Sequence, residues 1–154
     1  MKHNLFVSLP ILLALMILSS CDPIGNLFFN KTFRAGKVEM SFSADGGKDE
    51  TSIVNSSHKP VKGKTGWIFS QVYTVDEKNN FKYILLQDKE EELPDGTYMV
   101  DAGWVKFYYP KKRNKIRVEV APNPNKEMRK LIFDGGGGPV YYINIVIKQA
   151  GKTD

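Results

Sequence analysis

Few side chains in this sequence are of the kinds that perform covalent chemistry. The chain has one cysteine, Cys21, and one histidine beyond its first few residues, His58. These counts cannot supply the ligands of a Cys/His zinc site, and a serine or cysteine triad would depend on His58 alone. The sequence therefore predicts no metal site, no cofactor and no catalytic residue built on these groups.

Carboxylates are the other candidates for catalysis. Five of them fall between Gln87 and Thr97, at Asp88, Glu90, Glu91, Glu92 and Asp95. A glycosidase needs two carboxyl groups roughly 5 to 10 Å apart, and its acid must be partly buried to raise its pKa. A contiguous acidic run beside a proline is instead typical of a solvated loop, with a weak calcium contact as the alternative. We therefore expect that the protein is not an enzyme.

The strongest candidate binding site is a row of aromatic residues. From residue 104 to residue 109 the side chains alternate between two faces, with Trp104, Lys106 and Tyr108 on one and Val105, Phe107 and Tyr109 on the other. If Val105 and Phe107 face a core, the opposite face could stack on sugar rings and hydrogen-bond their hydroxyls. Tyr142 would extend this row if its strand lay in the same sheet. The alternative is that Trp104 is a core anchor, as buried tryptophans often are in β-sandwiches.

Basic residues are scattered, apart from one short group after Pro110 that consists of Lys111, Lys112, Arg113 and Lys115. A nucleic-acid binder normally concentrates its basic residues in a stripe, so we expect no nucleic-acid partner. The group is expected to be a solvated hairpin tip, with contact to an anionic polymer as the alternative. The glycines 135–138 precede no predicted helix, so they lack the context of a phosphate-binding loop and indicate a hairpin turn.

Strands, not helices, are expected to position these residues. Apolar and polar side chains alternate from Ile116 to Val120, which is the period of a strand with one buried face, and prolines and asparagines end the pattern directly afterwards. Similar runs predict strands near 38–43, 50–55, 67–75, 81–86, 98–100, 104–109, 116–120, 131–133 and 140–148. Strands at this spacing indicate an all-β sandwich of about seven to nine strands, with Trp67 and Phe69 in its core.

The C-terminal third also carries a recognisable pattern. The run V-x-V-A-x-N ends at Asn123, an arginine follows six residues later at Arg129, and I-x-I-x-I-K-Q-A-G runs from Ile143 to Gly151. This pattern closely resembles the end of the BACON domain, an immunoglobulin-like β-sandwich that is common in Bacteroidota lipoproteins and polysaccharide-utilisation proteins. The resemblance implies an immunoglobulin-like fold.

The rest of the chain resembles the same family more loosely. Residues 38–55 resemble its opening hairpin with a Gly-Gly turn, and Trp67 and Trp104 lie roughly where the family places tryptophans. The resemblance covers about residues 37–151. The chain departs from the family at residues 74–97, which are longer and more charged than usual.

The N-terminus is predicted to be a targeting segment. About 14 mostly apolar residues, Leu5–Leu18, follow a short basic start. This run is shorter than the roughly 20 residues that span a bilayer as a helix, so a cleaved signal peptide over residues 1–20 is expected. The tetrad Leu18-Ser19-Ser20-Cys21 resembles a bacterial lipobox, which implies lipidation of Cys21. An ordinary secretory signal with a chance cysteine is the alternative.

Without residues 1–20 the chain has 134 residues and a formal charge of +4, enough for one domain. Residues 21–36 are predicted to be a lipid-anchored linker, and residues 37–154 the sandwich domain. Because the linker is rich in leucine and phenylalanine, part of it is expected to lie against the domain as an extra edge strand. Acyl chains contribute about 0.8 kcal/mol per buried methylene and would hold the protein on the cell envelope; the family resemblance implies the outer membrane.

These observations predict a non-catalytic binding module on a membrane-anchored lipoprotein. Glycans or glycoproteins are the expected ligands, as the family's name implies. The alternative is a structural or partner-docking subunit of a cell-envelope protein complex. An outward aromatic row would favour a glycan, whereas a large apolar patch or an unpaired edge strand would favour a protein partner.

Overall fold

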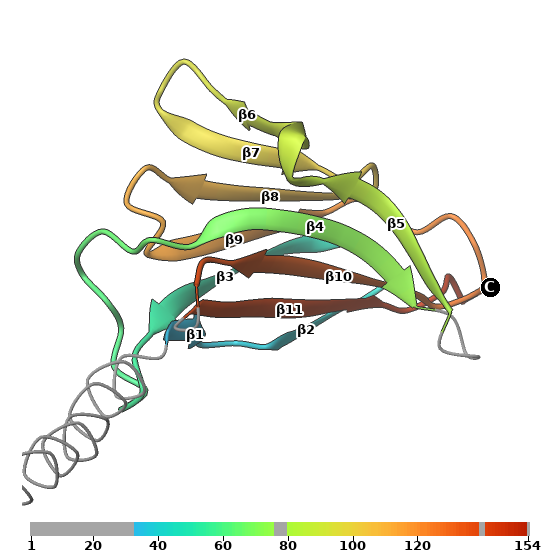
Figure 1. Cartoon of the computed structure of the whole chain (residues 1–154). Coiled ribbons are helices and arrows are strands. Elements are labelled where there is room, and N and C mark those ends of the chain that lie inside the picture. Colours follow the sequence, from blue (N-terminus) through green and yellow to red (C-terminus); the bar gives the residue numbers. More distant parts are fainter. Residues whose placement is uncertain (1–32, 76–79, 139–140, 154) are drawn as a thin grey trace, which may run out of the picture. The chain divides into compact units, whose positions relative to one another are not determined.

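A computed structural model describes residues 33–75, 80–138 and 141–153, and these residues fold almost entirely as β-strands (Figure 1). The elements are β1 (Phe33–Ala35), β2 (Glu39–Phe42), β3 (Gly47–Val54), β4 (Ile68–Val75), β5 (Phe81–Leu86), the 3₁₀ turn η1 (Gln87–Lys89), β6 (Glu90–Glu92), β7 (Thr97–Asp101), β8 (Val105–Pro110), β9 (Lys115–Val120), β10 (Arg129–Gly136) and β11 (Tyr141–Gln149). The all-β fold is thus confirmed. The described residues form eleven strands where the pattern predicted seven to nine.

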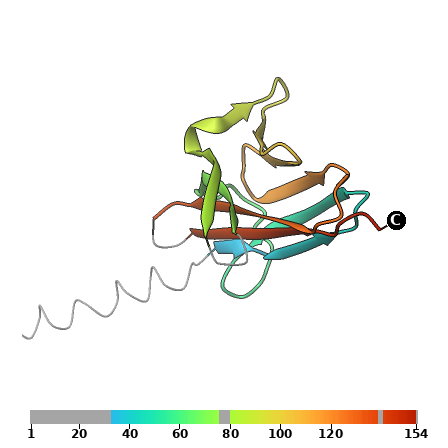
Figure 2. The same cartoon turned by 90° about the vertical axis from the view of Figure 1, so that its right-hand side faces the viewer.

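The strands form one hydrogen-bonded sheet that curls over to make two packed layers (Figures 1 and 2). The order is β5-β4-β10-β11-β1-β3-β9-β8-β7-β6, and β2 also pairs with β11. We call the half with β5, β4, β10, β11, β1 and β2 the β10 layer, and the half with β3, β9, β8, β7 and β6 the β8 layer. Aromatic rings of β8 and β10 meet between the layers, so the two outer faces point away from each other.

The short strand β1 lies in the segment predicted to be a linker. It was expected at an edge, but it lies between β11 and β3, parallel to the first and antiparallel to the second. Ala35 at its end is almost fully buried opposite Ile53. Because β1 bonds on both sides, it joins the two layers into one continuous sheet.

The core follows the alternation of the strands. The inward side chains of β8, β9 and β11 are Val105, Phe107, Tyr109, Ile116, Val118, Val120, Ile143, Ile145 and Ile147, and all are buried. Phe133 of β10 lies among them, with its ring centroid 4.5 Å from that of Phe107 and 5.5 Å from that of Phe69. Trp67 and Phe69 are buried as predicted.

Part of the predicted glycine turn belongs to a strand. Gly135 is the seventh residue of β10, and a Cβ atom there would lie 2.9 Å from the ring of Trp67. This close approach leaves room only for glycine beside the largest core side chain. The chain turns later, where Gly138 has a φ of +63° that favours glycine.

Asn123, which ends the first part of the C-terminal sequence pattern, fixes loops at one end of the sandwich. Its side-chain amide donates to the carbonyl oxygens of Glu127 (2.9 Å) and Ala150 (3.0 Å). Its backbone N–H donates to the carbonyl oxygen of Ala44 at 2.7 Å. The side chain is buried, so these bonds stabilise the loop without competition from water.

Arg129 and Gln149, from the same pattern, complete this end of the sandwich. The Arg129 Nε donates to Oε1 of Gln149 at 2.9 Å, and its Nη2 donates to the carbonyl oxygen of Ala121 at 3.1 Å. The buried Gln149 amide in turn donates to the carbonyl oxygens of Ser43, Ala44 and Ala121. The residues of the pattern therefore have structural roles here.

Two predictions fall on the N-terminal part of the chain. The signal peptide, residues 1–20, and the lipidated Cys21 lie outside the described residues. Within residues 33–153 that are described, no helix has the length and hydrophobicity to cross a membrane.

Candidate binding site

The outer face of β8 carries the predicted aromatic row. Val105 and Phe107 are fully buried, which was the condition for the neighbouring side chains to face outward. Trp104, Lys106 and Tyr108 are each partly exposed. Lys106 and Tyr108 therefore lie along the outer face of β8, and Trp104, directly before the strand, borders the same pocket as Lys106.

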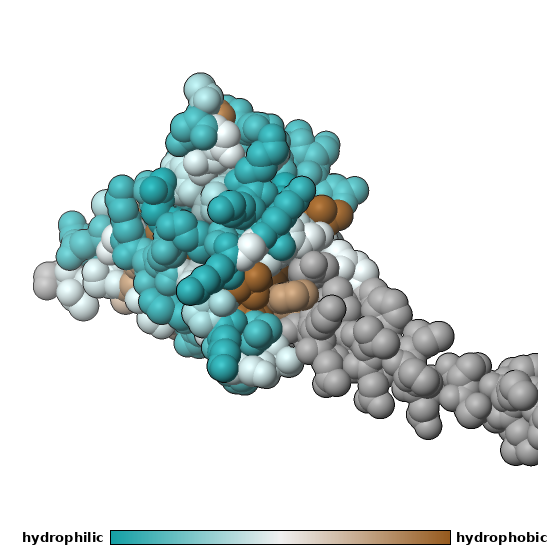
Figure 3. All heavy atoms as spheres, turned by 90° about the vertical axis from the view of Figure 1, so that its left-hand side faces the viewer, coloured by the Kyte–Doolittle hydropathy of each residue, from teal (hydrophilic) through white to brown (hydrophobic). Residues whose placement is uncertain are grey.

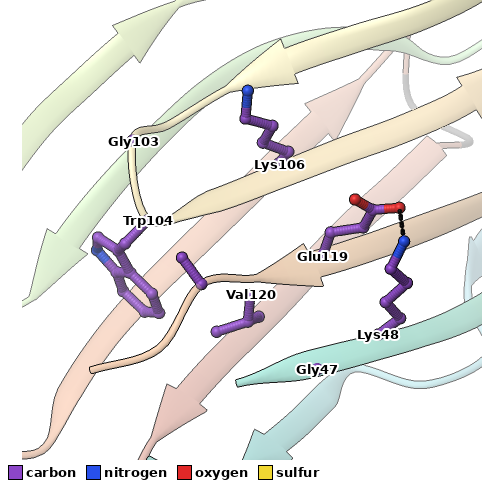
Figure 4. A pocket seen from close by; sticks show the side chains of 8 residues that line it. Gly47, Lys48, Gly103, Trp104, Lys106, Glu119 and Val120 are labelled. Atoms are coloured by element: carbon purple, nitrogen blue, oxygen red, sulfur yellow. Dashed lines mark hydrogen bonds and ion pairs between the residues drawn. The ribbon is translucent and has the colours of Figure 1, made fainter. Parts of the chain in front are cut away.

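Trp104 and Lys106 line a shallow pocket of about 250 Å³ (Figure 4). Its other walls come from the start of β3, the turn before β8 and the end of β9, through Gly47, Lys48, Gly103, Glu119, Val120 and Ala121. Two of these residues form an ion pair across neighbouring strands, with Nζ of Lys48 2.9 Å from Oε1 of Glu119. The pocket therefore combines one aromatic ring with two cations, one anion and a rim of small residues.

Trp104 is neither a fully buried anchor nor a free side chain. It packs against the buried core and remains partly exposed. The guanidinium carbon of Arg129 lies 4.2 Å from its ring centroid, a cation–π contact. The Trp104 carbonyl oxygen accepts a hydrogen bond of 2.9 Å from the N–H of Ala121. These contacts hold the indole at the pocket wall.

Lys106 is held by its cross-strand neighbour on β7. Its Nζ lies 2.8 Å from Oδ2 of Asp101, which faces it in the β7–β8 register. The hydrogen bond from Lys106 lowers the pKa of Asp101, and the same bond raises the pKa of Lys106. The ammonium group therefore stays charged and keeps a fixed direction, although nearly half of the side chain is exposed.

Tyr108 lies two residues further along β8 and borders a second shallow pocket, of about 210 Å³. The guanidinium carbon of Arg117 lies 4.6 Å from the Tyr108 ring centroid. Lys115 and Glu50 form an ion pair of 3.0 Å in the same wall. Two residues of a strand span about 7 Å, so the two pockets follow each other along β8.

Tyr142 does not extend this row, contrary to the sequence-based prediction. It is 61% exposed, but it lies on β11 in the β10 layer. Because β1, β3 and β9 separate β11 from β8 in the sheet, Tyr142 is on the opposite outer face. The prediction depended on which strands share a layer, and this depends on pairing between distant segments.

The sequence did not predict that Lys48, Glu119 and Arg117 line these pockets. Alternation in the predicted strand at 116–120 placed Arg117 and Glu119 on its polar face. Only the register brings them to the row, with Lys106 opposite Glu119 and Tyr108 opposite Arg117. Lys48 comes from a strand more than 50 residues earlier, also opposite Glu119. A run of residues in sequence cannot indicate such a register.

The basic group after Pro110 is not wholly a solvated tip. Its Arg113 turns inward with a positive φ of 51°, and only 14% of its side chain is exposed. Both terminal nitrogens donate to the carboxylate of Glu90, at 3.0 and 2.6 Å. Its guanidinium carbon lies within 5.2 Å of the ring centroids of Trp67, Tyr98 and Tyr109. The surface at this end of the sandwich is mostly hydrophilic (Figure 3).

Glu90, from the acidic run, therefore has a structural role and is not part of a solvated loop. Besides Arg113 it accepts a hydrogen bond of 2.5 Å from the hydroxyl of Tyr109. Burial raises the pKa of Tyr109, and the bond to Glu90 raises it further. Burial alone would lower the pKa of Arg113, but its bonds to Glu90 outweigh that effect. In the described part of the chain, no group of three or more His, Cys, Asp or Glu residues could hold a metal ion.

The outer face of the β10 layer has a different character. The large exposed apolar side chains among the described residues are Val38, Ile68, Phe81, Tyr83, Ile84, Leu86, Met128 and Tyr142, and six of these eight belong to β4, β5 or β11. Between them, Nε2 of Gln71 donates to Oδ2 of Asp134 at 3.2 Å. Burial raises the pKa of Asp134, and the Gln71 bond opposes this only in part. Among the described residues, fewer ion pairs lie on this face than on the β8 layer.

Comparison with solved structures gives similarity of fold. A Bacteroides thetaiotaomicron protein solved by NMR matches with a TM-score of 0.50 at 17% identity, over 77% of this chain and 80% of that chain. The first immunoglobulin domain of the mouse polymeric immunoglobulin receptor matches with a TM-score of 0.38 at 6% identity, over 80% and 99% of the two chains. No protein-family model matches the sequence, and no curated protein matches it.

Proposed function

We propose that this protein is a non-catalytic binding module for glycans. The observation that supports this most directly is the pocket beside Trp104, where an aromatic wall lies next to Lys48, Lys106 and Glu119. Aromatic rings pack against the apolar face of a sugar. Ammonium and carboxylate groups can hydrogen-bond its hydroxyls as donors and acceptors.

The charges of the pocket favour a neutral saccharide. Lys48 is paired with Glu119, and Lys106 is paired with Asp101. Neither cation is left to attract a carboxylate or sulfate group, and the pairs are already oriented before a ligand arrives. Such preorganisation reduces the entropy lost on binding. Tyr108 and the second pocket would contact a further ring of the same chain.

A glycan-array screen of residues 22–154 tests this proposal. The wild-type protein should bind neutral glycans, and Trp104→Ala and Tyr108→Ala should abolish or weaken the signal while circular dichroism shows an intact fold. Tyr142→Ala, on the opposite face, is the matched control and should bind normally. Silence of the wild-type protein across host and dietary glycans would refute the proposal.

We further propose that the protein is a lipoprotein of the cell envelope, anchored through Cys21 and located at the outer membrane. The lipobox-like tetrad and the resemblance to BACON-domain lipoproteins support this. Full-length protein in cells fed with a radiolabelled fatty acid should become labelled, and Cys21→Ala should remove the label. A wild-type protein without label would leave an ordinary secretory signal as the explanation.

A second candidate function is docking of a protein partner, as in an envelope complex. It is favoured by the strand β5, which ends the sheet and exposes apolar side chains. A glycan site on one outer face and a protein contact on the other are compatible.

A further inference from the structure

The edge of β5 is a surface that a further strand would complete. The strand pairs with β4 on one side, and within the described residues no strand pairs with its other side (Figure 1). Phe81, Tyr83 and Leu86 are 61%, 58% and 55% exposed. A row of unpaired backbone donors and acceptors beside apolar side chains is a template for another strand.

The opposite end of the sheet shows how such an edge can be protected. There β6 is three residues long, and its residues are Glu90, Glu91 and Glu92. Short strands and charged side chains discourage pairing with other chains. The strand β5 has twice that length and one charged residue, Lys82. Lys82 and the irregular register between β4 and β5 protect the β5 edge only in part, so it is more open to pairing than the β6 edge.

The charges near this edge indicate which strand would cover it. Lys82 is the second residue of β5, and Asp88 lies in η1 directly after the strand. Both are exposed, and neither has an ion-pair partner among the described residues. In an antiparallel pair of identical strands, the start of each strand meets the end of the other. Each Lys82 would then lie beside the turn η1 of the other copy, which carries Asp88.

We propose that β5 pairs antiparallel with β5 of a second copy of this chain. In the register that pairs residues 82–86 of the two copies, Ile84 lies opposite Ile84, and each Lys82 lies opposite Leu86, two residues before the Asp88 of the other copy. Apolar side chains then meet between two contacts of opposite charge. A twofold axis perpendicular to the sheet relates the copies and makes their β10 layers one continuous sheet. This inference extends the docking function and does not depend on glycan binding.

The area of this contact determines how stable the dimer is expected to be. Two six-residue edges bury less than the roughly 1,200 Å² at which stable interfaces begin. The dimer should therefore be weak in dilute solution and favoured where copies are concentrated on one membrane. For this reason the test belongs in intact cells with the full chain.

Site-specific photocrosslinking provides the test. A photoreactive phenylalanine analogue replaces Tyr83 in full-length protein, and two differently tagged copies are expressed together in bacteria. Irradiation should give a species of twice the monomer mass that carries both tags. The same analogue at Tyr142, equally exposed on β11, should not. No cross-link at position 83, or a cross-link only to a different protein, would overturn the proposal.

Charge exchange then tests the register. Lys82→Asp or Asp88→Lys alone brings like charges close together at both ends of the strand pair and should lower the cross-linked yield about tenfold. The two changes together restore opposite charges and should restore the yield. Single variants without effect, or a double variant that is not rescued, would refute the antiparallel register. Glycan binding by the same variants should be unchanged, so failure of either proposal can be recognised separately.

Discussion

On the outer face of the β8 layer, charged side chains are paired across neighbouring strands, whereas the outer face of the β10 layer exposes apolar side chains. The pairs on the β8 layer include Lys48–Glu119, Lys106–Asp101 and Lys115–Glu50, at 2.8 to 3.0 Å. The β10 layer has Lys148–Glu39 at 2.7 Å, and most of the exposed large apolar side chains lie on its strands or beside them.

Because of this difference, the two faces are suited to different kinds of ligand. A face with paired charges and shallow aromatic pockets is stable in water as it is, and it offers fixed polar groups to a small hydrated ligand. A face with exposed apolar residues and a free edge gains stability when a protein covers it. One sandwich thus presents a surface suited to a sugar and, on its other side, a surface suited to a protein strand.

The largest expected effect concerns the contribution of ion pairs to stability in the β8 layer. Glu90→Ala leaves Arg113 without its partner in a mostly buried position, which should lower the free energy of unfolding by about 2 to 4 kcal/mol. Glu39→Ala, which breaks an exposed pair in the β10 layer, should cost less than about 1 kcal/mol. Urea denaturation of both variants measures this. Equal losses would contradict the distinction between the layers.

The next effect concerns ligand binding. Trp104→Ala should lower the affinity for a bound neutral glycan about tenfold, because an aromatic contact contributes roughly 1.5 kcal/mol. Tyr142→Ala should leave it unchanged. Isothermal titration calorimetry with the best glycan from the array measures both. A loss at Tyr142 and none at Trp104 would move the site to the β10 layer.

The pH dependence of stability should have opposite signs on the two faces. Asp101 has a lowered pKa, so it stabilises the fold above its unfolded pKa of about 3.8, and this is lost as the pH falls through the folded value. Asp134 has a raised pKa, so its ionisation destabilises the fold as the pH rises above about 3.8.

Two isosteric variants separate these contributions. As the pH rises from 3 to 7, the free energy of unfolding of Asp101→Asn should fall relative to that of wild type. The free energy of unfolding of Asp134→Asn should rise relative to that of wild type. Urea titrations across this range measure the difference. A common sign for both variants would show that the two carboxylates have similar surroundings.

The smallest effect is expected for a single surface pair at the pocket. Lys48→Ala should cost no more than about 0.5 kcal/mol of stability, because the ion pair is exposed. Glycan affinity should nevertheless fall measurably, because a fixed donor is lost. A stability loss without an affinity loss would mean that Lys48 only supports the fold.

Alternation within one strand predicted only those site residues that lie on that strand. Lys106 and Tyr108 were placed correctly on the outer face because Val105 and Phe107 are strongly apolar and follow a strict period of two. Trp104, directly before the strand, packs partly against the core as well. The apolar strand at 81–86 was also predicted, but its run of large apolar residues is typical of a buried strand. Its position at an edge depends on pairing with β4 alone, which its sequence does not indicate.

Other features required three-dimensional information. Tyr142 could extend the row only if its strand lay beside β8, and its layer is decided by the pairing of β11 with β10 and β1. Arg113 appeared to belong to a solvated basic turn, but its positive φ directs the side chain back onto three aromatic rings. In both cases the side chain's neighbours come from distant parts of the chain.

The position of β1 has a mechanical consequence. A pulling force on the chain ahead of Phe33 acts first on β1, which is hydrogen-bonded to β11 on one side and β3 on the other. Edge strands can be peeled away one bond at a time, but a strand bonded on both sides must break both ladders together. If the protein is tethered at Cys21 and holds a large ligand on β8, tension therefore passes into both layers of the sandwich at once.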